Sequence, residues 1–280
     1  MRTQEDFPVA TRLMAPAHRP AVADFYRLAR AADDVADDPR RTEGEKLDAL
    51  DRHAAGLAGE AGGSAEGLAL HRRMVALGLL GSLDHARDLL AAFRLDARGA
   101  DCADWDALMG YCALSAAPVG RFLLDLHGEG RAARVHADPL CAALQVLNHL
   151  RDLAPDWRDL GRLYMPADWR REAGAEPGAL LEGRLDGPWS QVVQRALDGC
   201  DALLDAAEGL PGAVMDRRLA AESAATLSVA RRIAARLRAG DPVARRIVPT
   251  ALDAARAGLR GAATWAGRAV GGARPGLPRA

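Results

Sequence analysis

The stretch Gln145-Val-Leu-Asn-His-Leu-Arg-Asp-Leu-Ala-Pro-Asp156 places one amide and two carboxylates on a segment that is otherwise largely apolar. Asn148, Asp152 and Asp156 are spaced four apart, so a helix would align them on one stripe, with Gln145 on the same face. Polar groups on a central helix are costly unless they are hydrogen-bonded or bound to a metal. The stripe therefore predicts either a buried hydrogen-bond network or a metal site inside a helical bundle.

A second acidic cluster, Asp-Asp-Val-Ala-Asp-Asp, occupies residues 33–38 at the end of an expected helix over 18–38. Its like charges repel one another, and a helix C-terminus already carries partial negative charge. Mg²⁺ would remove this cost, because it binds a few carboxylates, keeps some waters and bridges to phosphate oxygens. Arg30, one turn earlier, could pair with these carboxylates or contact a phosphate. The alternative is a solvated acidic helix end.

The rest of the sequence is typical of an all-α protein. Apolar residues make up 49% of the 280 residues but aromatic residues only 4%, and the abundant Ala and Leu favour helices over strands. Periodicity, with Gly, Pro or Asp in the gaps, predicts further helices over 43–58, 65–80, 82–97, 104–127, 138–153, 189–209, 217–239 and 243–269. No shift in composition divides the chain, so we expect one domain over 1–269 and a disordered tail over 270–280.

Charge and cysteine content exclude several classes of protein. The formal net charge is −1, so the chain has no basic field to attract nucleic acid. Its four cysteines lie far apart with no Cys-x-x-Cys pair, which argues against a zinc or disulfide framework and fits a reducing cytoplasm. We find no signal peptide and no uninterrupted apolar run of about 18 residues, so we expect a cytoplasmic protein without a membrane span.

The two acidic clusters are more specific together than either is alone. If they face each other across a helical bundle, they form a cage for several Mg²⁺ ions and a diphosphate. The ions would neutralise the leaving group as the carbon–oxygen bond breaks, and apolar walls would keep a carbocation away from water. We therefore expect an all-α bundle with a central cavity that binds Mg²⁺ and a diphosphate.

At these residues the chain resembles the squalene/phytoene synthase family, which has the isoprenoid synthase fold. The resemblance covers roughly residues 5–170, and beyond it only the helical pattern and the region around Glu222 and 230–233 are similar. Six ordered motifs carry it: Asp-Phe-Pro-Val-Ala (6–10), Arg-Ala-Ala-Asp-Asp-Val-Ala-Asp (30–37), Ala-Phe-Arg-Leu-Asp (92–96), Tyr-Cys-Ala-Leu-Ser-Ala-Ala-Pro-Val-Gly-Arg (111–121), the 145–156 stretch and Gly-Arg-Leu-Tyr-Met-Pro (161–166).

The resemblance implies roles for individual residues. It implies two metal sites, with the ligands Asp33, Asp34 and Asp37 at the first and Asn148, Asp152 and Asp156 at the second. Substrate-binding residues near the diphosphate would be Arg30, Gln145, Arg162 and Tyr164. Tyr111 matches a tyrosine that faces the reacting centre, where its hydroxyl or ring stabilises cationic intermediates. The implied catalytic residues are therefore Arg30, Asp33, Tyr111 and Asp152.

Within the family, the Phe-Pro-Val-Ala, Ser-Ala-Ala-Pro-Val-Gly and Pro-Asp-Trp-Arg stretches resemble the bacterial hydroxysqualene synthase branch. Such enzymes ionise presqualene diphosphate, rearrange the cation and capture it with water, for squalene and hopanoid biosynthesis. The resemblance implies two or three Mg²⁺ ions and no NADPH, in line with the absence of a Gly-x-Gly-x-x-Gly motif. Two alternatives stay open: a head-to-head prenyl transferase (presqualene diphosphate, squalene or phytoene synthase), and a non-catalytic helical lipid-binding or assembly partner.

Two residues depart from the pattern of this branch. Pro155 lacks the amide that would bond to the carbonyl of Arg151, and it disfavours helical angles at the residue before it. We therefore expect Asp156 on a bent segment, where it binds metal through water or not at all. Arg151 resembles the phytoene and presqualene diphosphate synthases more than the hydroxysqualene synthases.

The expected partners follow from the substrate. Presqualene or farnesyl diphosphate is an apolar chain with an anionic head, so we expect it to arrive from the membrane. The Arg-rich region 231–268 is a candidate for peripheral attachment to the inner membrane. No nucleic-acid partner is expected, and contacts with pathway enzymes stay open.

Overall fold

In the computed structural model, which describes residues 15–185 and 187–271, every regular element is a helix. The α-helices are α1 (Arg19–Asp37), α2 (Glu43–Ala58), α3 (Ala65–Leu77), α4 (Leu83–Ala97), α5 (Trp105–Ser115), α6 (Ala117–Leu126), α7 (Arg134–Arg151), α8 (Leu153–Leu160), α9 (Ala167–Ala173), α10 (Gly187–Ala207), α11 (Leu210–Ala213), α12 (Arg217–Ala239) and α13 (Ala251–Gly271). Short 3₁₀ turns lie at Leu80–Ser82, Arg131–Ala133 and Pro177–Glu182. The prediction of an all-α fold is confirmed.

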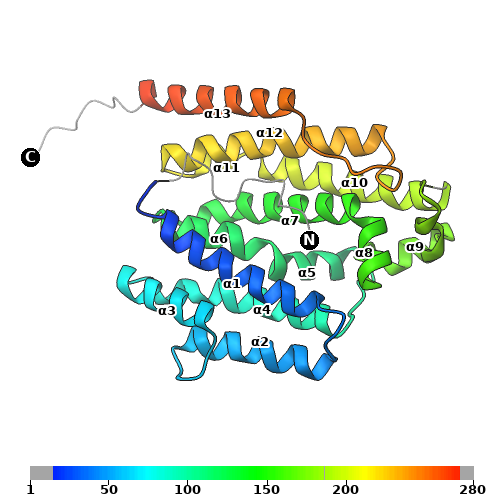
Figure 1. The fold of residues 1–280 in the computed structure, drawn as a ribbon. Coiled ribbons are helices and arrows are strands. Elements are labelled where there is room, and N and C mark those ends of the chain that lie inside the picture. The colour runs from blue at the N-terminus through cyan, green and yellow to red at the C-terminus, as the bar shows by residue number, and fades with distance from the viewer. Residues whose placement is uncertain (1–14, 186, 272–280) are drawn as a thin grey trace, which may run out of the picture.

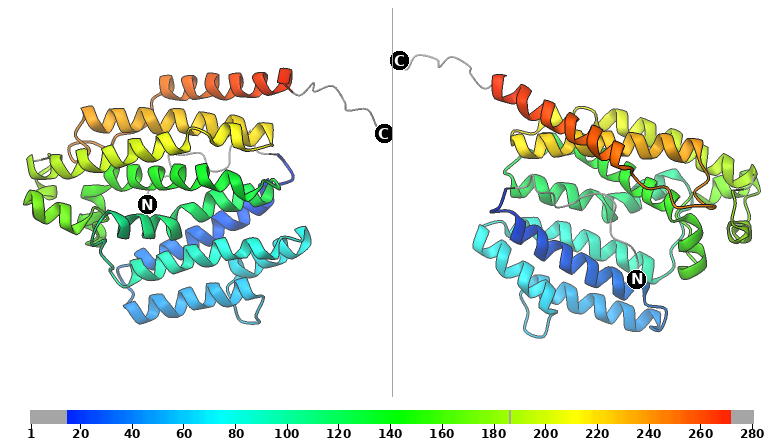
Figure 2. Two further views of the ribbon diagram at one scale, coloured as in Figure 1. Left: turned by 180° about the vertical axis from the view of Figure 1, so that it is seen from behind. Right: turned by 45° about the horizontal axis from the view of Figure 1, so that its top comes forward.

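The helices are stacked in layers. Figure 1 shows α2 at one edge, followed by α1, α3 and α4, then α5, α6 and α7, and finally α10, α12 and α13 at the opposite edge. The views in Figure 2 keep this order, with α13 outermost beside α12. The short helices α8 and α9 lie together at one end of the stack. In this arrangement α7 is a central helix, as its apolar sequence predicted.

Two buried apolar clusters fill the bundle. One joins α1–α4 to α6, and in it the rings of Phe25 and Phe122 stack with their centroids 4.2 Å apart. The other surrounds α7, α10 and α12, where the fully buried Trp189 donates its indole N–H to the carbonyl of Glu176 at 2.8 Å. α1 packs in the first cluster and α7 in the second. Polar side chains that lie between these two helices therefore line a cavity and do not enter either apolar cluster.

Some helix boundaries differ from the prediction. The helix expected over 104–127 is divided at Ala116 (φ −125°, ψ −48°) into α5 and α6, because the ring of Pro118 clashes with the carbonyl four residues earlier. The last helix begins at Ala251 rather than 243, after a loop over 241–250. It continues to Gly271, two residues into the expected tail. The remaining tail residues, 272–280, lie outside the described part of the chain.

One segment, Trp105–Leu126, is long and apolar enough to cross a membrane by length and composition alone. In the structure this segment is the pair α5 and α6, which packs against α4 and α7 inside the bundle. Its residues Leu108, Cys112 and Phe122 are buried in the two apolar clusters. Core helices satisfy the same criterion as membrane spans, so this pair is accounted for by packing within the bundle.

Candidate active site

A polar cavity of about 440 Å³ lies between α1, α5, α7 and α8. It brings together residues that are more than 100 positions apart in the sequence, such as Asp33 and Asp152. Every predicted site residue except Asp34 lines it: Arg30, Asp33, Asp37, Tyr111, Gln145, Asn148, Asp152, Asp156, Arg162 and Tyr164. The two acidic clusters therefore face one cavity, which is the condition stated above for a shared metal and diphosphate site.

On α1, helical spacing separates the acidic residues into two directions. Asp33 and Asp37 are one turn apart and line the cavity, while the side chain of Asp34 is 60% exposed and pairs with Nη2 of Arg30 at 2.8 Å. The other nitrogen of Arg30, Nη1, lies 3.4 Å from Asp33. The structure thus leaves Asp34 outside the cavity, and its assignment as a metal ligand stays a prediction without geometric support.

The second cluster lies across a helix break. α7 ends at Arg151 and α8 begins at Leu153, with Asp152 at the junction (φ −104°, ψ 14°). The break follows from Pro155, which has no N–H for the Arg151 carbonyl and whose ring crowds that carbonyl. The amides of Asp152 and Asp156 still donate to carbonyls four residues earlier, at 2.9 and 2.7 Å. Asp156 therefore lies on a bent segment as expected, yet it lines the same cavity as Asp152.

Arginines balance the charge of the carboxylates. Arg162 donates from Nη1 to Asp37 at 2.5 Å and from Nη2 to the carbonyl of Ala36 at 2.7 Å. Nε of Arg246 lies 3.2 Å from Oδ1 of Asp152. Together with Arg30 beside Asp33, these contacts give the cavity both the carboxylates that bind cations and the guanidinium groups that bind phosphate.

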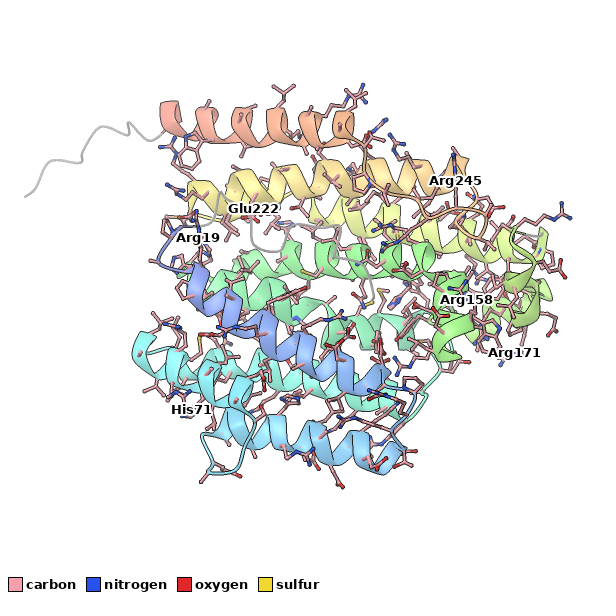
Figure 3. The ribbon with its side chains drawn as sticks, viewed as in Figure 1. Arg19, His71, Arg158, Arg171, Glu222 and Arg245 are labelled. Carbon is pink, nitrogen blue, oxygen red and sulfur yellow. The ribbon has the colours of Figure 1, made fainter. Side chains whose placement is uncertain are left out.

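Arg246 was not predicted from the sequence, because no motif marks the 241–250 loop. Figure 3 labels its neighbour Arg245 on this loop, at the same end of the bundle as Arg158 of α8. The almost fully buried Arg151 holds the loop in place by donating from Nε to the carbonyl of Ile247 at 2.6 Å. A buried arginine on an apolar helix needs a hydrogen-bond partner. The presence of Arg151 in the sequence was therefore the one signal that another segment of the chain, here the 241–250 loop, packs against α7.

A hydrogen-bonded cluster forms the wall beside α5. The hydroxyls of Tyr111 and Tyr164 both donate to Asp96, to Oδ2 at 2.9 Å and to Oδ1 at 3.0 Å. The ring of Tyr164 stacks on His149 with centroids 3.7 Å apart, and the ring of Tyr111 lies 5.2 Å from that of Tyr164. Asp96 belongs to the 92–96 motif but had no assigned role, and His149 was not singled out.

Burial sets the protonation of this cluster. Burial raises the pKa of Asp96, against the opposing effect of Arg162 and the two tyrosine hydroxyls. Burial also raises the pKa of both Tyr111 and Tyr164 well above that of a free phenol, so both hydroxyls keep their protons. The same effect lowers the pKa of His149 to about 3. His149 is therefore a neutral ring in the wall of the cavity.

Apolar cavities adjoin the polar one. A cavity of about 160 Å³ between α1, α6 and α7 is lined by side chains such as Val22, Phe25 and Leu144, and it shares Ser115 and Asn148 with the polar cavity. A further apolar cavity of about 110 Å³ shares Leu144 with the first. The site as a whole is therefore suited to a molecule with an anionic head and a long apolar tail.

The donor atoms around the polar cavity are compatible with Mg²⁺. Among the described residues, no group of three His, Cys, Asp or Glu side chains could hold a metal ion unaided. Mg²⁺ is usually held by one or two carboxylates together with waters and phosphate oxygens. Its oxygen donors here would be Asp33, Asp37, Asn148, Asp152 and Asp156. This donor set fits Mg²⁺ that binds together with a diphosphate, rather than in a cage made by the protein alone.

Comparison with known proteins agrees with the geometry. The family model described as squalene/phytoene synthase matches residues 1–267. The chain is 40% identical over 220 residues to hydroxysqualene synthase of Zymomonas mobilis, covering 79% of this chain and 74% of that protein. It is 38% identical over 230 residues to hydroxysqualene synthase of Sinorhizobium fredii, covering 82% of this chain and 78% of that protein.

A solved structure shows the same fold. The squalene synthase HpnC from Alicyclobacillus acidocaldarius superposes with a TM-score of 0.70 at 28% identity, over 83% of this chain and 87% of that one. The fold and the resemblance expected from the motifs are both confirmed. From its sequence, its fold and the composition of its cavity, the chain belongs to the squalene/phytoene synthase family.

Proposed function

We propose that this protein is a hydroxysqualene synthase, which converts presqualene diphosphate and water into hydroxysqualene and diphosphate. The observation that carries the proposal is the shared wall between the arginine- and carboxylate-lined cavity and the apolar cavities. A prenyl diphosphate bound across this wall has its head among charges and its tails among apolar side chains. Similarity to two proteins named hydroxysqualene synthase supports this branch of the family.

Binding of the head group exchanges one set of ion pairs for another. Arg30, Arg162 and Arg246 contact carboxylates in the absence of substrate, and each can turn to the diphosphate oxygens, which accept the same fork of N–H donors. The carboxylates released by this exchange, with Asn148 and Asp156, would hold Mg²⁺, whose charge stabilises the departing diphosphate.

The cation left after ionisation needs an environment that neither reacts with it nor repels it. The rings of Tyr111, Tyr164 and His149 form one wall of the cavity, and aromatic faces attract cations. Because burial lowers the pKa of His149 to about 3, this ring adds no positive charge to the wall. Capture of the cation by water requires no hydride donor, so NADPH is not expected as a cofactor.

We also propose that the protein works at the membrane surface, with α13 as the contact. This helix covers α12 at the edge of the bundle (Figure 2), and it leaves Leu252 and Leu259 exposed at 57% and 72%. The exposed Arg256 lies beside them, whereas the one acidic residue of the helix, Asp253, is buried. An exposed face with leucines and arginine and no acid favours anionic lipid.

The decisive experiment is incubation of purified protein and Mg²⁺ with presqualene diphosphate, and separately with farnesyl diphosphate, followed by mass spectrometry. Formation of hydroxysqualene from presqualene diphosphate, with none in the presence of a chelator, is the expected outcome. Consumption of farnesyl diphosphate to a C30 diphosphate would instead assign the protein to the condensing enzymes. Absence of diphosphate release from either substrate would favour a non-catalytic lipid-binding role.

A further inference from the structure

The polar cavity contains one carboxylate that neither pairs with an arginine side chain nor aligns with the acidic stripes. Asp96 lies near the end of α4 with only 7% of its surface exposed, and each of its oxygens accepts one tyrosine hydroxyl. A buried carboxylate is expensive for the fold. Tyr111 and Tyr164, which donate to it, line the same cavity. The free-energy cost of burying this carboxylate is therefore incurred at the candidate active site.

We infer that Asp96 accepts, through Tyr111 or Tyr164, the proton released when water adds to the carbocation. The inference rests on the proposed function, because only an enzyme that captures its cation with water has such a proton to remove. It assigns a base to the last step of the reaction. The residues proposed to surround the diphosphate do not fill this role; this head-group site consists of Arg30, Asp33, Asp37, Asn148, Asp152, Asp156, Arg162 and Arg246.

The step balances without any further reactant. A lone pair of the water oxygen forms the new bond to the cationic carbon, and one O–H bond of that water breaks. Its proton moves to the phenol oxygen, while the phenol's own proton moves along the 2.9 or 3.0 Å hydrogen bond to the carboxylate of Asp96. The cation becomes a neutral alcohol, Asp96 becomes a neutral acid, and nothing is oxidised or reduced. Release of the proton to solvent then restores the carboxylate.

The other basic groups of the cavity are less well placed for this role. Asp33, Asp37 and Asp152 contact arginines and belong to the head-group site. The Nε2 atom of His149 is buried without a hydrogen-bond partner, so no hydroxyl connects it to the cavity. For Asp96, burial raises the pKa, and a carboxylate with a raised pKa accepts a proton more readily than an exposed one.

The test is the Asp96→Asn variant, which keeps the shape and one oxygen acceptor but cannot take up a proton. With presqualene diphosphate and Mg²⁺, we expect diphosphate release within about threefold of the unmodified protein, and a fall of about tenfold or more in the ratio of alcohol to diphosphate. The missing alcohol should be replaced by hydrocarbon formed through proton loss from the cation. Asp96→Glu, which restores a proton acceptor, should recover part of the alcohol.

Tyr111→Phe and Tyr164→Phe identify the hydroxyl that carries the proton, since only that variant should lower the product ratio. A matched control is Asp125→Asn, which alters another partly buried carboxylate with several donors, outside the cavity. This control should leave the ratio unchanged. If Asp96→Asn lowers alcohol and diphosphate in the same proportion, including complete loss of both, the inference is overturned. Failure of the unmodified protein to form any alcohol would overturn the proposed function itself.

Discussion

Asp33 and Asp152 are the residues on which the two acidic clusters can be tested most directly. We expect Asp33→Ala and Asp152→Ala each to lower turnover by about 100-fold or more, because in the proposed function each carboxylate holds Mg²⁺, whose positive charge stabilises the departing diphosphate. Helical circular dichroism should be unchanged, since neither side chain is part of the apolar core. Turnover by a coupled diphosphate assay measures the effect.

Asp34→Ala is the matched control, as it removes the neighbouring carboxylate that points away from the cavity. Its turnover should stay within about threefold of the unmodified protein. Near-native turnover in either Asp33→Ala or Asp152→Ala would contradict the assignment of the head-group site.

Among the residues of the cavity, spacing predicted the stripe from Gln145 to Asp156, whereas Tyr111, Arg162 and Tyr164 were expected there only from the family resemblance. Asn148, Asp152 and Asp156 could be recognised because side chains four apart on an apolar helix must share a face. Spacing places Asp33 and Asp34 on adjacent strips of the helix, but it could not show which strip faces the cavity, since the orientation of α1 depends on its packing against other helices. Arg246 and His149 were missed for a similar reason: their place at the site depends on contacts between distant segments, and no local pattern records such contacts.

The break between α7 and α8 is a feature whose effect on metal binding can be measured. Pro155→Ala restores an N–H that can donate to the Arg151 carbonyl. Because Asp152 and Asp156 already line one cavity, we expect the Mg²⁺ concentration for half-maximal diphosphate release to stay within about twofold. A several-fold increase in apparent Mg²⁺ affinity would show that the proline holds Asp156 away from the metal.

The exposed face of α13 predicts that this helix binds the protein to anionic lipid. Leu252→Asp combined with Leu259→Asp should abolish co-sedimentation with vesicles that contain anionic lipid, because each change removes apolar contact and adds repulsion. Leu181→Asp is the matched control, since this leucine is 56% exposed on a different part of the chain. Equal binding of both variants would contradict attachment through α13.

Helical periodicity predicted the long α-helices of the described residues, because each buries one apolar face. It did not predict the short helices α8, α9 and α11. It failed where prolines act within an apolar run, as at Ala116 between α5 and α6. It also failed over 243–250, where the chain is a loop. Helical pattern continues into that segment, but the hydrogen bond from Arg151 to Ile247 holds it in another conformation, and no local propensity predicts such a bond.

For the molecule as a whole, the arginine–carboxylate pairs predict that Mg²⁺ and diphosphate stabilise the fold only together. Mg²⁺ alone must compete with arginines for the carboxylates, and diphosphate alone must compete with carboxylates for the arginines. When both bind, each set of groups receives a new partner. At about 100 times the joint dissociation constant we expect a rise in Tm of roughly 5 °C or more, with little change for either alone.

Differential scanning fluorimetry with Mg²⁺, diphosphate and both together measures this effect. Additive shifts from the separate ligands would contradict the exchange of partners. Arg246→Ala should lower the joint shift, whereas Arg256→Ala, which alters an exposed arginine on α13, should not change it.

The place of Arg246 in the chain also bears on how the enzyme is made. Synthesis proceeds from the N-terminus, and segments begin to fold as they emerge. Both acidic clusters therefore leave the ribosome well before the loop that carries Arg246 and that Arg151 anchors. A partly synthesised chain holds the carboxylates of both acidic clusters without their full complement of arginines. The nascent protein thus lacks the ion pair between Arg246 and Asp152 until the C-terminal part of the chain has joined the bundle.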